Sequence, residues 1–338
     1  MSRLLVFNPE HDYALAHGGA FYMAPSSIKR LSSELEFLPI IWSRDDDFLL
    51  LSDDRILSVT EPHRVINSNV KIESVEPWGW DLALTHRLQK LGIDSRILPS
   101  PDQIEQIRIL SHRRISIECN QYLHSPLIPR EFSEVNEALD FYKTNPNCYF
   151  KQPWSSGGRG VVATEELDES RVGEWLTGCI RKQGSVIAEP GINRVLDFSS
   201  LWDITDSEIE FYGLSVSISD GRGKYGGNLF GPQEKLWELI RGFAPSFSND
   251  ILEAQRKFVE NKLAGTYKGK IGIDMMADKE GKIYPCVEIN LRRTMGHTAI
   301  DYFKLLNEDE NSNHWKRKCR FSSLRSIEDF KRQSYKYN

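Results

Sequence analysis

The segment FKQPWSSGGRGVV, residues 150–162, carries the strongest local signal in this chain of 338 residues. It predicts a strand that delivers Lys151, a loop of small residues, and then a second strand. Small residues let backbone N–H groups converge on an anion, and a lysine adds positive charge for phosphate oxygens. A Walker A loop has the reverse order, because its lysine follows the glycines and precedes a helix. The segment therefore indicates another kind of phosphate loop, with a glycine-rich hairpin and an unrelated lysine as the alternative.

A second signal is the segment GIDMMADKEGKIYPCVEINLRR, residues 272–293. The turn residues at 278–281 predict a hairpin of two strands. Side chains two apart in a strand share a face, so Glu288 and Asn290 point the same way and Asp274 of the partner strand can lie near them. Carboxylate and amide oxygens suit Mg²⁺ that carries nucleotide phosphates. An edge hairpin with one polar face is the alternative interpretation.

The third signal lies between these two, in SVIAEPGINRVLD at residues 185–197. It predicts a strand that ends in the acid Glu189, followed by a bend and a second acid, Asp197. Alone, it is an ordinary junction between a strand and a loop.

In this order, the three segments resemble the ATP-grasp superfamily over roughly residues 104–302. The resemblance implies a mixed α+β and α/β protein with the ATP-grasp fold, in which two α+β subdomains grip ATP. A Rossmann-like N-terminal α/β domain precedes them. The expected limits are 1–102 for the N-terminal domain, 103–190 and 191–305 for the two subdomains, and 306–338 for a basic C-terminal tail.

The resemblance also implies roles for individual residues. Those expected to bind ATP are Arg113, Lys151, Ser155, Ser156, Gly157, Gly158, Ile187, Ala188, Glu189 and Asp197. Arg114 is an alternative to Arg113 for the early cation of the family. Magnesium, with Mn²⁺ as an alternative ion, is expected on Asp274, Glu288 and Asn290. Arg292 keeps the arginine of the family's Asn-Pro-Arg pattern without its proline, and is expected to be catalytic together with Lys151.

The implied activity is that of an ATP-dependent carboxylate–amine ligase that releases ADP and phosphate. Its partners would be a small-molecule carboxylate and an amine, with the substrate pocket lined by the loop after Asn8, by Arg292 and by the loop near Tyr225. One alternative is a small-molecule kinase on the same fold. The other is a nucleotide-binding protein without turnover.

The N-terminal hundred residues alternate between strand and helix patterns. Strands are expected at residues 4–7, 38–42 and 93–98, and helices at 27–36 and 80–91. This alternation predicts an open α/β sheet, whose ligand crevice lies beyond strand ends, where the loop after Asn8 falls. A single helix is expected over residues 103–123.

Composition excludes several classes of protein. The chain is 40% hydrophobic and 27% charged, with a net charge of -5, which argues against membrane and nucleic-acid partners. The five cysteines are scattered and the N-terminus has no secretory pattern, so a reducing cytoplasm is expected. A homo-oligomer is compatible with the sequence. The basic residues of 316–336 indicate a solvated tail, with an anion-binding tail as the alternative.

The pattern G-x-G-x-x-G at residues 221–226 also invites a dinucleotide-binding interpretation. That fingerprint needs a helix directly after it, and LFGP at 229–232 does not start one. A substrate loop or lid is the favoured interpretation.

Overall fold

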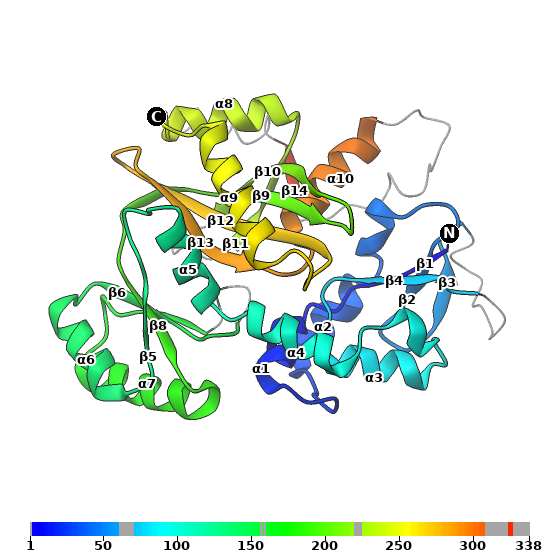
Figure 1. Ribbon diagram of the computed structural model, residues 1–338, viewed down its shortest axis with the longest axis horizontal. Coiled ribbons are helices and arrows are strands. Elements are labelled where there is room, and N and C mark those ends of the chain that lie inside the picture. The colour runs from blue at the N-terminus through cyan, green and yellow to red at the C-terminus, as the bar shows by residue number, and fades with distance from the viewer. Residues whose placement is uncertain are drawn as a thin grey trace.

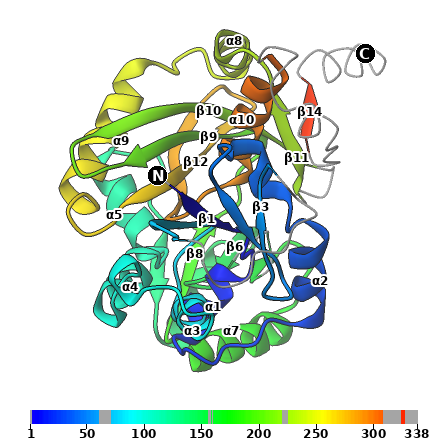
Figure 2. The same ribbon diagram turned by 90° about the vertical axis from the view of Figure 1, so that its right-hand side faces the viewer.

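A computed structural model describes residues 2–60, 71–155, 158, 160–219, 225–307 and 324–326. Three units are visible in Figure 1: an N-terminal sheet with its helices at the right, a small sheet at the lower left, and a large sheet above. Figure 2 shows the N-terminal unit in front of the large sheet when the molecule is turned.

The N-terminal unit is an α/β layer built on four strands in the order β3-β2-β1-β4. Its strands are β1 (Arg3–Val6), β2 (Phe48–Leu50), β3 (Ile56–Ser58) and β4 (Ser74–Pro77). Strand β1 runs parallel to β2 and β4, whereas β3 is antiparallel to β2. Leu4 and Leu5 are both fully buried and belong to different apolar clusters, so both sheet faces are covered. The helices are α1 (His11–His17), α2 (Ser26–Glu34) and α3 (Leu82–Lys90).

Two strands expected in this unit are absent from the structure. Residues 38–42 form the 3₁₀ turn η1 (Leu38–Trp42), because Pro39 lacks the N–H that a strand ladder needs and favours the first turn of a helix. Residues 93–98 contain the 3₁₀ turn η2 (Ser95–Ile97), whose start is fixed by the Asp94 side chain accepting from the Arg96 N–H. Both apolar runs are buried as turns, so the strand predictions were wrong.

The single helix expected over residues 103–123 is two helices, α4 (Pro101–Leu110) and α5 (Arg114–Tyr122). Ser100 and Gln103 form a capping box that starts α4. The helical conformation is interrupted at residues 111–113, where the Arg113 N–H donates to the Pro153 carbonyl at 3.1 Å. Side chains of both helices share one apolar core with the large sheet, among them Ile104 and Ile115. The expected domain limits stay a prediction.

The small unit is an antiparallel sheet in the order β5-β8-β6-β7. Its strands are β5 (Arg130–Phe132), β6 (Cys148–Lys151), β7 (Val161–Ala163) and β8 (Val186–Pro190), and its helices are α6 (Val135–Thr144) and α7 (Glu169–Gln183). Phe150, Val172 and Leu176 are fully buried in the core between sheet and helices.

The large unit is a sheet in the order β13-β12-β9-β10-β11-β14. Its strands are β9 (Arg194–Ile204), β10 (Ile209–Ser219), β11 (Tyr225–Phe230), β12 (Gly269–Asp278), β13 (Ile283–Asn290) and β14 (Leu324–Ser326). The helices are α8 (Gln233–Phe243), α9 (Asn249–Lys262) and α10 (Met295–Asn307). Along β9, Phe198 and Trp202 enter the main apolar core, so Asp197 and Ser199 face the other side, where the candidate site lies.

Candidate active site

Lys151 and Glu189 form a buried ion pair in the small sheet. Strands β6 and β8 are neighbours, and the Lys151 ammonium contacts the Glu189 carboxylate. Their side chains are only 10% and 8% exposed. Ile187 lies directly opposite Lys151 in the ladder, and Ala188 opposite Phe150. The structure thus brings the lysine before the glycine-rich loop next to the strand expected to hold adenine.

Arg113 joins the small sheet to the large one. One guanidinium nitrogen, Nη1, donates to Ser155 Oγ at 2.7 Å and to the Gln152 carbonyl. The other, Nη2, donates to Glu288 Oε1 at 2.7 Å. Arg114 instead points to Glu131 and is half exposed, so it lies outside this cluster.

The structure describes Ser155, Gly158 and Gly160 of the glycine-rich loop. Ser155 is buried against Arg113, and Gly158 is exposed with φ +75°, a left-handed conformation that glycine adopts without strain. Gly160 has φ +78°, and a Cβ there would lie 2.5 Å from the Gln152 side chain. Ser156 and Gly157, two of the expected ATP-binding residues, lie outside the described residues.

Asp274, Glu288 and Asn290 lie together on one face of the large sheet. Asp274 stands opposite Glu288 in the β12–β13 ladder. Its Oδ2 accepts from Asn290 Nδ2 at 3.0 Å, and its Oδ1 accepts from Ser199 Oγ at 2.7 Å. Ser199 was not anticipated. The alternation along β9, which places Ser199 on the same face as Asp197, could have indicated it.

The donor set fits a magnesium ion of the kind that carries nucleotide phosphates. Burial and the neighbouring Glu288 charge raise the pKa of Asp274 to about 6, so a divalent cation between the two carboxylates would stabilise both. Magnesium in nucleotide sites usually takes one or two carboxylates plus phosphate oxygens. Within the described ranges, no cluster of three or more His, Cys, Asp or Glu side chains is placed to hold a metal. The candidate set therefore depends on two carboxylates and the Asn290 amide.

Arg292 links this face to the N-terminal unit. Strand β13 ends at Asn290, so Arg292 follows the strand rather than lying in it. It still reaches Asn290, since Nη2 donates to Asn290 Oδ1 at 2.8 Å. Its Nε donates to Asp12 Oδ2 at 2.9 Å, and the side chain is 11% exposed. Asp12 is thus a site residue that was not singled out, although its loop was expected to border the ligand crevice.

The loop after β1 adds further polar groups beside Asp12. Asn8 Nδ2 donates to the Gly79 carbonyl at 2.8 Å and fixes the loop against β4. Among the residues that the structure describes, neither ring nitrogen of His11 has a hydrogen-bond partner, nor does Oε2 of Glu10. Burial raises the pKa of Glu10. Unpaired polar atoms at the carboxyl end of a strand mark a place where a ligand can complete the hydrogen bonding.

Replacement of Gly79 by alanine is expected to destabilise the protein by about 1–3 kcal/mol, because a Cβ would lie 2.5 Å from the buried His11 ring. Gly178 is the matched control. It lies inside α7 with nothing within 4 Å of a Cβ, so alanine there should stabilise by up to about 1 kcal/mol. Chemical denaturation measures both changes. Equal unfolding free energies for the two variants would contradict the close packing of Gly79 on His11.

The remaining candidates lie around this cluster. Asp197 accepts from Arg194 Nη1 at 3.3 Å; burial raises its pKa, while the nearby Arg194 and Lys151 charges lower it. Tyr225 donates to Asn228 Oδ1, but residues 221–224 of the expected lid lie outside the described part of the chain. His297, which was not among the expected site residues, is fully buried, and burial together with the Arg293 charge holds its pKa well below the usual range.

Comparison with solved structures identifies the fold. D-alanyl-alanine synthetase A from Vibrio cholerae aligns with a TM-score of 0.50 and 14% identity over 94% of each chain. D-Alanine-D-alanine ligase from Helicobacter pylori gives 0.50 and 15%, over 90% of this chain and 95% of that one. A biotin carboxylase in complex with β,γ-ATP from Campylobacter jejuni gives 0.52 and 12%, over 88% and 66%. The chain has the ATP-grasp fold with a preceding α/β domain, and that prediction is confirmed.

Comparison of sequences finds a weaker likeness. A [butirosin acyl-carrier protein]–L-glutamate ligase from Niallia circulans is 27% identical over 181 residues, which is 53% of this chain. The aligned part spans only 37% of the length of that relative. No protein-family model matches the sequence. In the described part of the chain, no helix is long and apolar enough to cross a membrane.

Proposed function

We propose that this protein is an ATP- and Mg²⁺-dependent ligase that joins a small-molecule carboxylate to an amine and releases ADP and phosphate. The observation that carries the proposal is the position of Arg113. It ties the phosphate-loop residue Ser155 to the candidate metal ligand Glu288 through two hydrogen bonds of 2.7 Å each. A phosphate chain lying between these groups would meet Lys151 on one side and the carboxylates on the other.

Phosphoryl transfer depends mainly on positioning and charge neutralisation, and each group of residues would have one of these roles. Lys151 and Arg113 would bind phosphate oxygens as fixed cations. Ile187, Ala188 and Glu189 would hold the adenine on β8, and Asp197 the ribose. Asp274, Glu288 and Asn290 would hold the magnesium, which supplies charge neutralisation at the β- and γ-phosphates.

The proposed reaction has two steps. A carboxylate oxygen of the first substrate attacks the γ-phosphorus, the bond to the β-phosphate oxygen breaks, and ADP leaves. The amine nitrogen then attacks the acyl carbon, phosphate leaves, and the amine releases a proton. Arg292 would hold the oxyanion on the acyl carbon, because its planar fork can offer two N–H groups to one carboxylate.

The Asp12–Arg292 pair also suggests the class of substrate. A carboxylate and a guanidinium 2.9 Å apart offer partners for an ammonium and a carboxylate on the same small molecule. An amino acid is therefore the substrate class that we propose to test first. We further propose a reducing, cytoplasmic location, since the four described cysteines are all free and buried.

The test is a screen for ADP release. Purified protein with Mg-ATP is offered pooled carboxylates, first alone and then with pooled amines. A ligase should release ADP at a rate that depends on both pools. Release with a carboxyl-free hydroxyl compound alone, giving a phosphorylated product, would show a kinase instead. No release under any condition, despite measurable ATP binding, would favour a protein without turnover.

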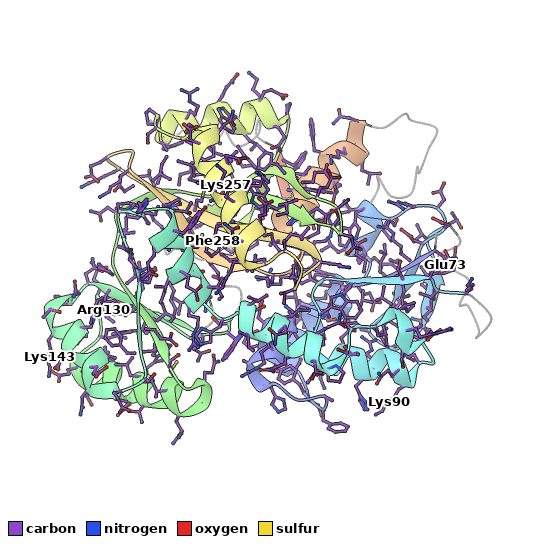
Figure 3. All side chains as sticks on the ribbon, in the orientation of Figure 1. Glu73, Lys90, Arg130, Lys143, Lys257 and Phe258 are labelled. Carbon is purple, nitrogen blue, oxygen red and sulfur yellow. The ribbon has the colours of Figure 1, made fainter. Side chains whose placement is uncertain are left out.

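Lys151→Ala is expected to weaken ATP binding by about 10–100-fold, since it removes a charge-assisted contact of about 1.5–3 kcal/mol. Calorimetric titration measures the affinity. The matched control is Lys257→Ala on the exposed surface of α9, which should bind ATP as the wild type does (Figure 3). Lys151→Ala leaves Glu189 without its lysine partner. A second variant, Lys151→Gln, and a thermal melt therefore check that the fold is kept. Wild-type affinity in a folded variant would remove Lys151 from the site.

A further inference from the structure

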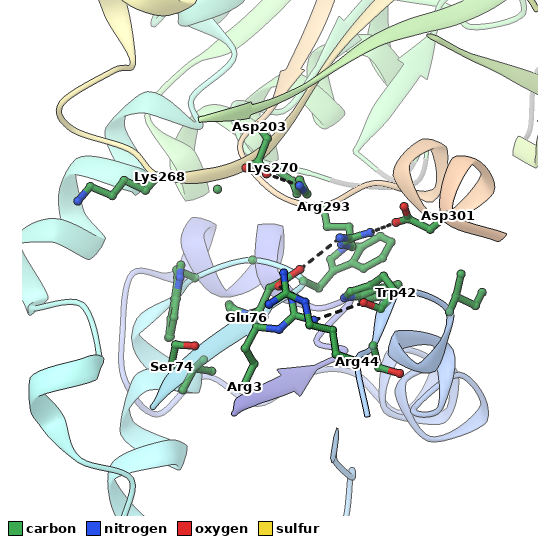
Figure 4. Close-up of a pocket in the computed structure, with 18 of the residues that line it drawn as sticks. Arg3, Trp42, Arg44, Ser74, Glu76, Asp203, Lys268, Lys270, Arg293 and Asp301 are labelled. Carbon is green, nitrogen blue, oxygen red and sulfur yellow. Dashed lines mark hydrogen bonds and ion pairs between the residues drawn. The ribbon is translucent and has the colours of Figure 1, made fainter. Parts of the chain in front are cut away.

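One cavity of the protein is separate from the candidate active site. It has a volume of about 960 Å³ and opens between β4 of the N-terminal unit and the ends of β9 and β12 in the large sheet (Figure 4). Ligand pockets in proteins commonly have about 300–1,000 Å³. None of the residues expected to bind ATP, metal or carboxylate lines it.

The cavity and the candidate active site share one wall. Arg292 and Arg293 are consecutive, yet Arg292 turns to Asn290 and Asp12 while Arg293 turns into the cavity. The Arg293 N–H donates to the Trp78 carbonyl at 2.9 Å, which fixes this wall to the N-terminal unit. The cavity and the candidate active site therefore lie on opposite sides of this wall.

The lining carries charges of both signs. Four acidic residues face six basic ones, which are Arg3, Arg44, Lys268, Lys270, Arg293 and Lys304. Arg293 is paired with Asp301 at 2.7 Å and Glu76 at 3.2 Å, and Lys270 is paired with Asp203 (Figure 4). Two carboxylates outside the lining also take part, since Arg3 is paired with Asp47 and Lys268 with Asp206. Within the described ranges, neither the Arg44 guanidinium nor the Lys304 ammonium forms an ion pair, although the Arg44 backbone N–H donates to Asp47 Oδ2 at 2.8 Å. Arg44 and Lys304 are thus the two cations of the lining whose side chains form no ion pair among the described residues.

Aromatic rings and two N–H donors without acceptors lie beside these cations. The Arg293 guanidinium lies 4.0 Å from the Trp42 ring, and Lys270 and Lys304 lie 4.3 and 4.7 Å from the Tyr212 ring. Arg293 is only 4% exposed, and its Nε–H lacks an acceptor among the described residues. The Nε1–H of Trp42 lacks one as well. Donors held in fixed positions beside unpaired cations favour an anion.

We propose that this cavity is a second binding site, separate from the nucleotide site, for a small polyanion that carries phosphate or carboxylate groups. Two negative charges on the ligand would match Arg44 and Lys304, which would be its partners at the rim. The inference does not depend on the proposed ligase activity.

The experiment is calorimetric titration in magnesium-free buffer with two probes, inorganic pyrophosphate and citrate. Saturable binding with one site per chain is expected. The double variant Arg44→Gln/Lys304→Gln should weaken it by about tenfold or more, because each substitution removes a charge-assisted contact. Both side chains are exposed, so the fold should persist, and a thermal melt verifies it. The control double variant Lys90→Gln/Lys257→Gln, on α3 and α9, should bind as the wild type does (Figure 3).

The Lys151→Ala variant locates the bound anion. Binding that survives Lys151→Ala and is lost in Arg44→Gln/Lys304→Gln supports the cavity. The reverse pattern would assign the anion to the nucleotide loop and overturn the proposal, as would no saturable binding or an equal loss in the control pair. If only pyrophosphate binds, the ligand class is a phosphate ester. If only citrate binds, it is a polycarboxylate. If both bind, the site selects its ligand by charge.

Discussion

Arg292→Lys is expected to leave ATP binding unchanged and to lower turnover by about 10²–10³-fold, the usual loss when one oxyanion donor is removed. Lysine keeps the charge beside Asp12 but loses the fork that lets Arg292 contact Asp12 and Asn290 at once, at 2.9 and 2.8 Å. The expected signature is a fall in kcat with little change in the dissociation constant of ATP. Calorimetry and the ADP-release assay measure the two quantities.

Arg256→Lys is the matched control for this substitution, because Arg256 pairs with Glu253 on the surface of α9. It should leave both quantities unchanged. If Arg292→Lys keeps full turnover, the arginine serves only as a structural partner of Asp12. If the variant fails to fold, as a thermal melt would reveal, the same structural interpretation is favoured.

Glu288→Gln is expected to reduce Mg²⁺-dependent turnover on the order of 10³-fold, because metal charge stabilisation is worth several kcal/mol and each factor of ten is about 1.4 kcal/mol. Glutamine keeps the size of the side chain and an oxygen for Arg113 Nη2, which donates to Glu288 at 2.7 Å. The change therefore removes mainly the negative charge. A titration of Mg²⁺ against ADP release should show a higher half-saturating concentration.

Binding of Mn²⁺, followed by its paramagnetic resonance in the presence of nucleotide, separates a ligand role from a structural one. Glu288→Gln should bind less Mn²⁺, whereas Glu253→Gln, on the exposed face of α9, should bind as the wild type does. An unchanged metal affinity in the Glu288 variant would refute the proposed set of Asp274, Glu288 and Asn290.

The resemblance of three ordered segments to the ATP-grasp superfamily predicted the fold, and the local periodicity of a strand predicted much of the candidate metal cluster. The two-residue repeat of a strand was enough to expect Glu288 and Asn290 on one face, with Asp274 of the partner strand near them. The structure places Asp274 opposite Glu288 in the ladder. The ion pair of Lys151 and Glu189 was not predicted, because it depends on β6 and β8 being neighbours in the sheet. Their roles in binding stay predictions.

Other features depend on contacts between distant parts of the chain, which periodicity does not encode. The helix break that separates Arg113 from Arg114 is fixed by the Pro153 carbonyl, and Asp12 meets Arg292 only in the folded protein. The strands expected at 38–42 and 93–98 were wrong for a different reason. A short apolar run is compatible with a strand or a buried turn, and the local contributions of Pro39 and Asp94 favoured the turn.

The ion pair between Asp12 and Arg292 joins residues that are 280 positions apart, and this has a consequence for synthesis on the ribosome. At about 5–20 residues per second, Arg292 follows Asp12 after roughly 15–60 s of translation. The N-terminal sheet can form early, since its four strands end at Pro77. During that interval, Asp12 in the loop after β1 lacks its partner Arg292. A nascent chain arrested before residue 292 should therefore expose this loop to protease, and completion of the large sheet should protect it.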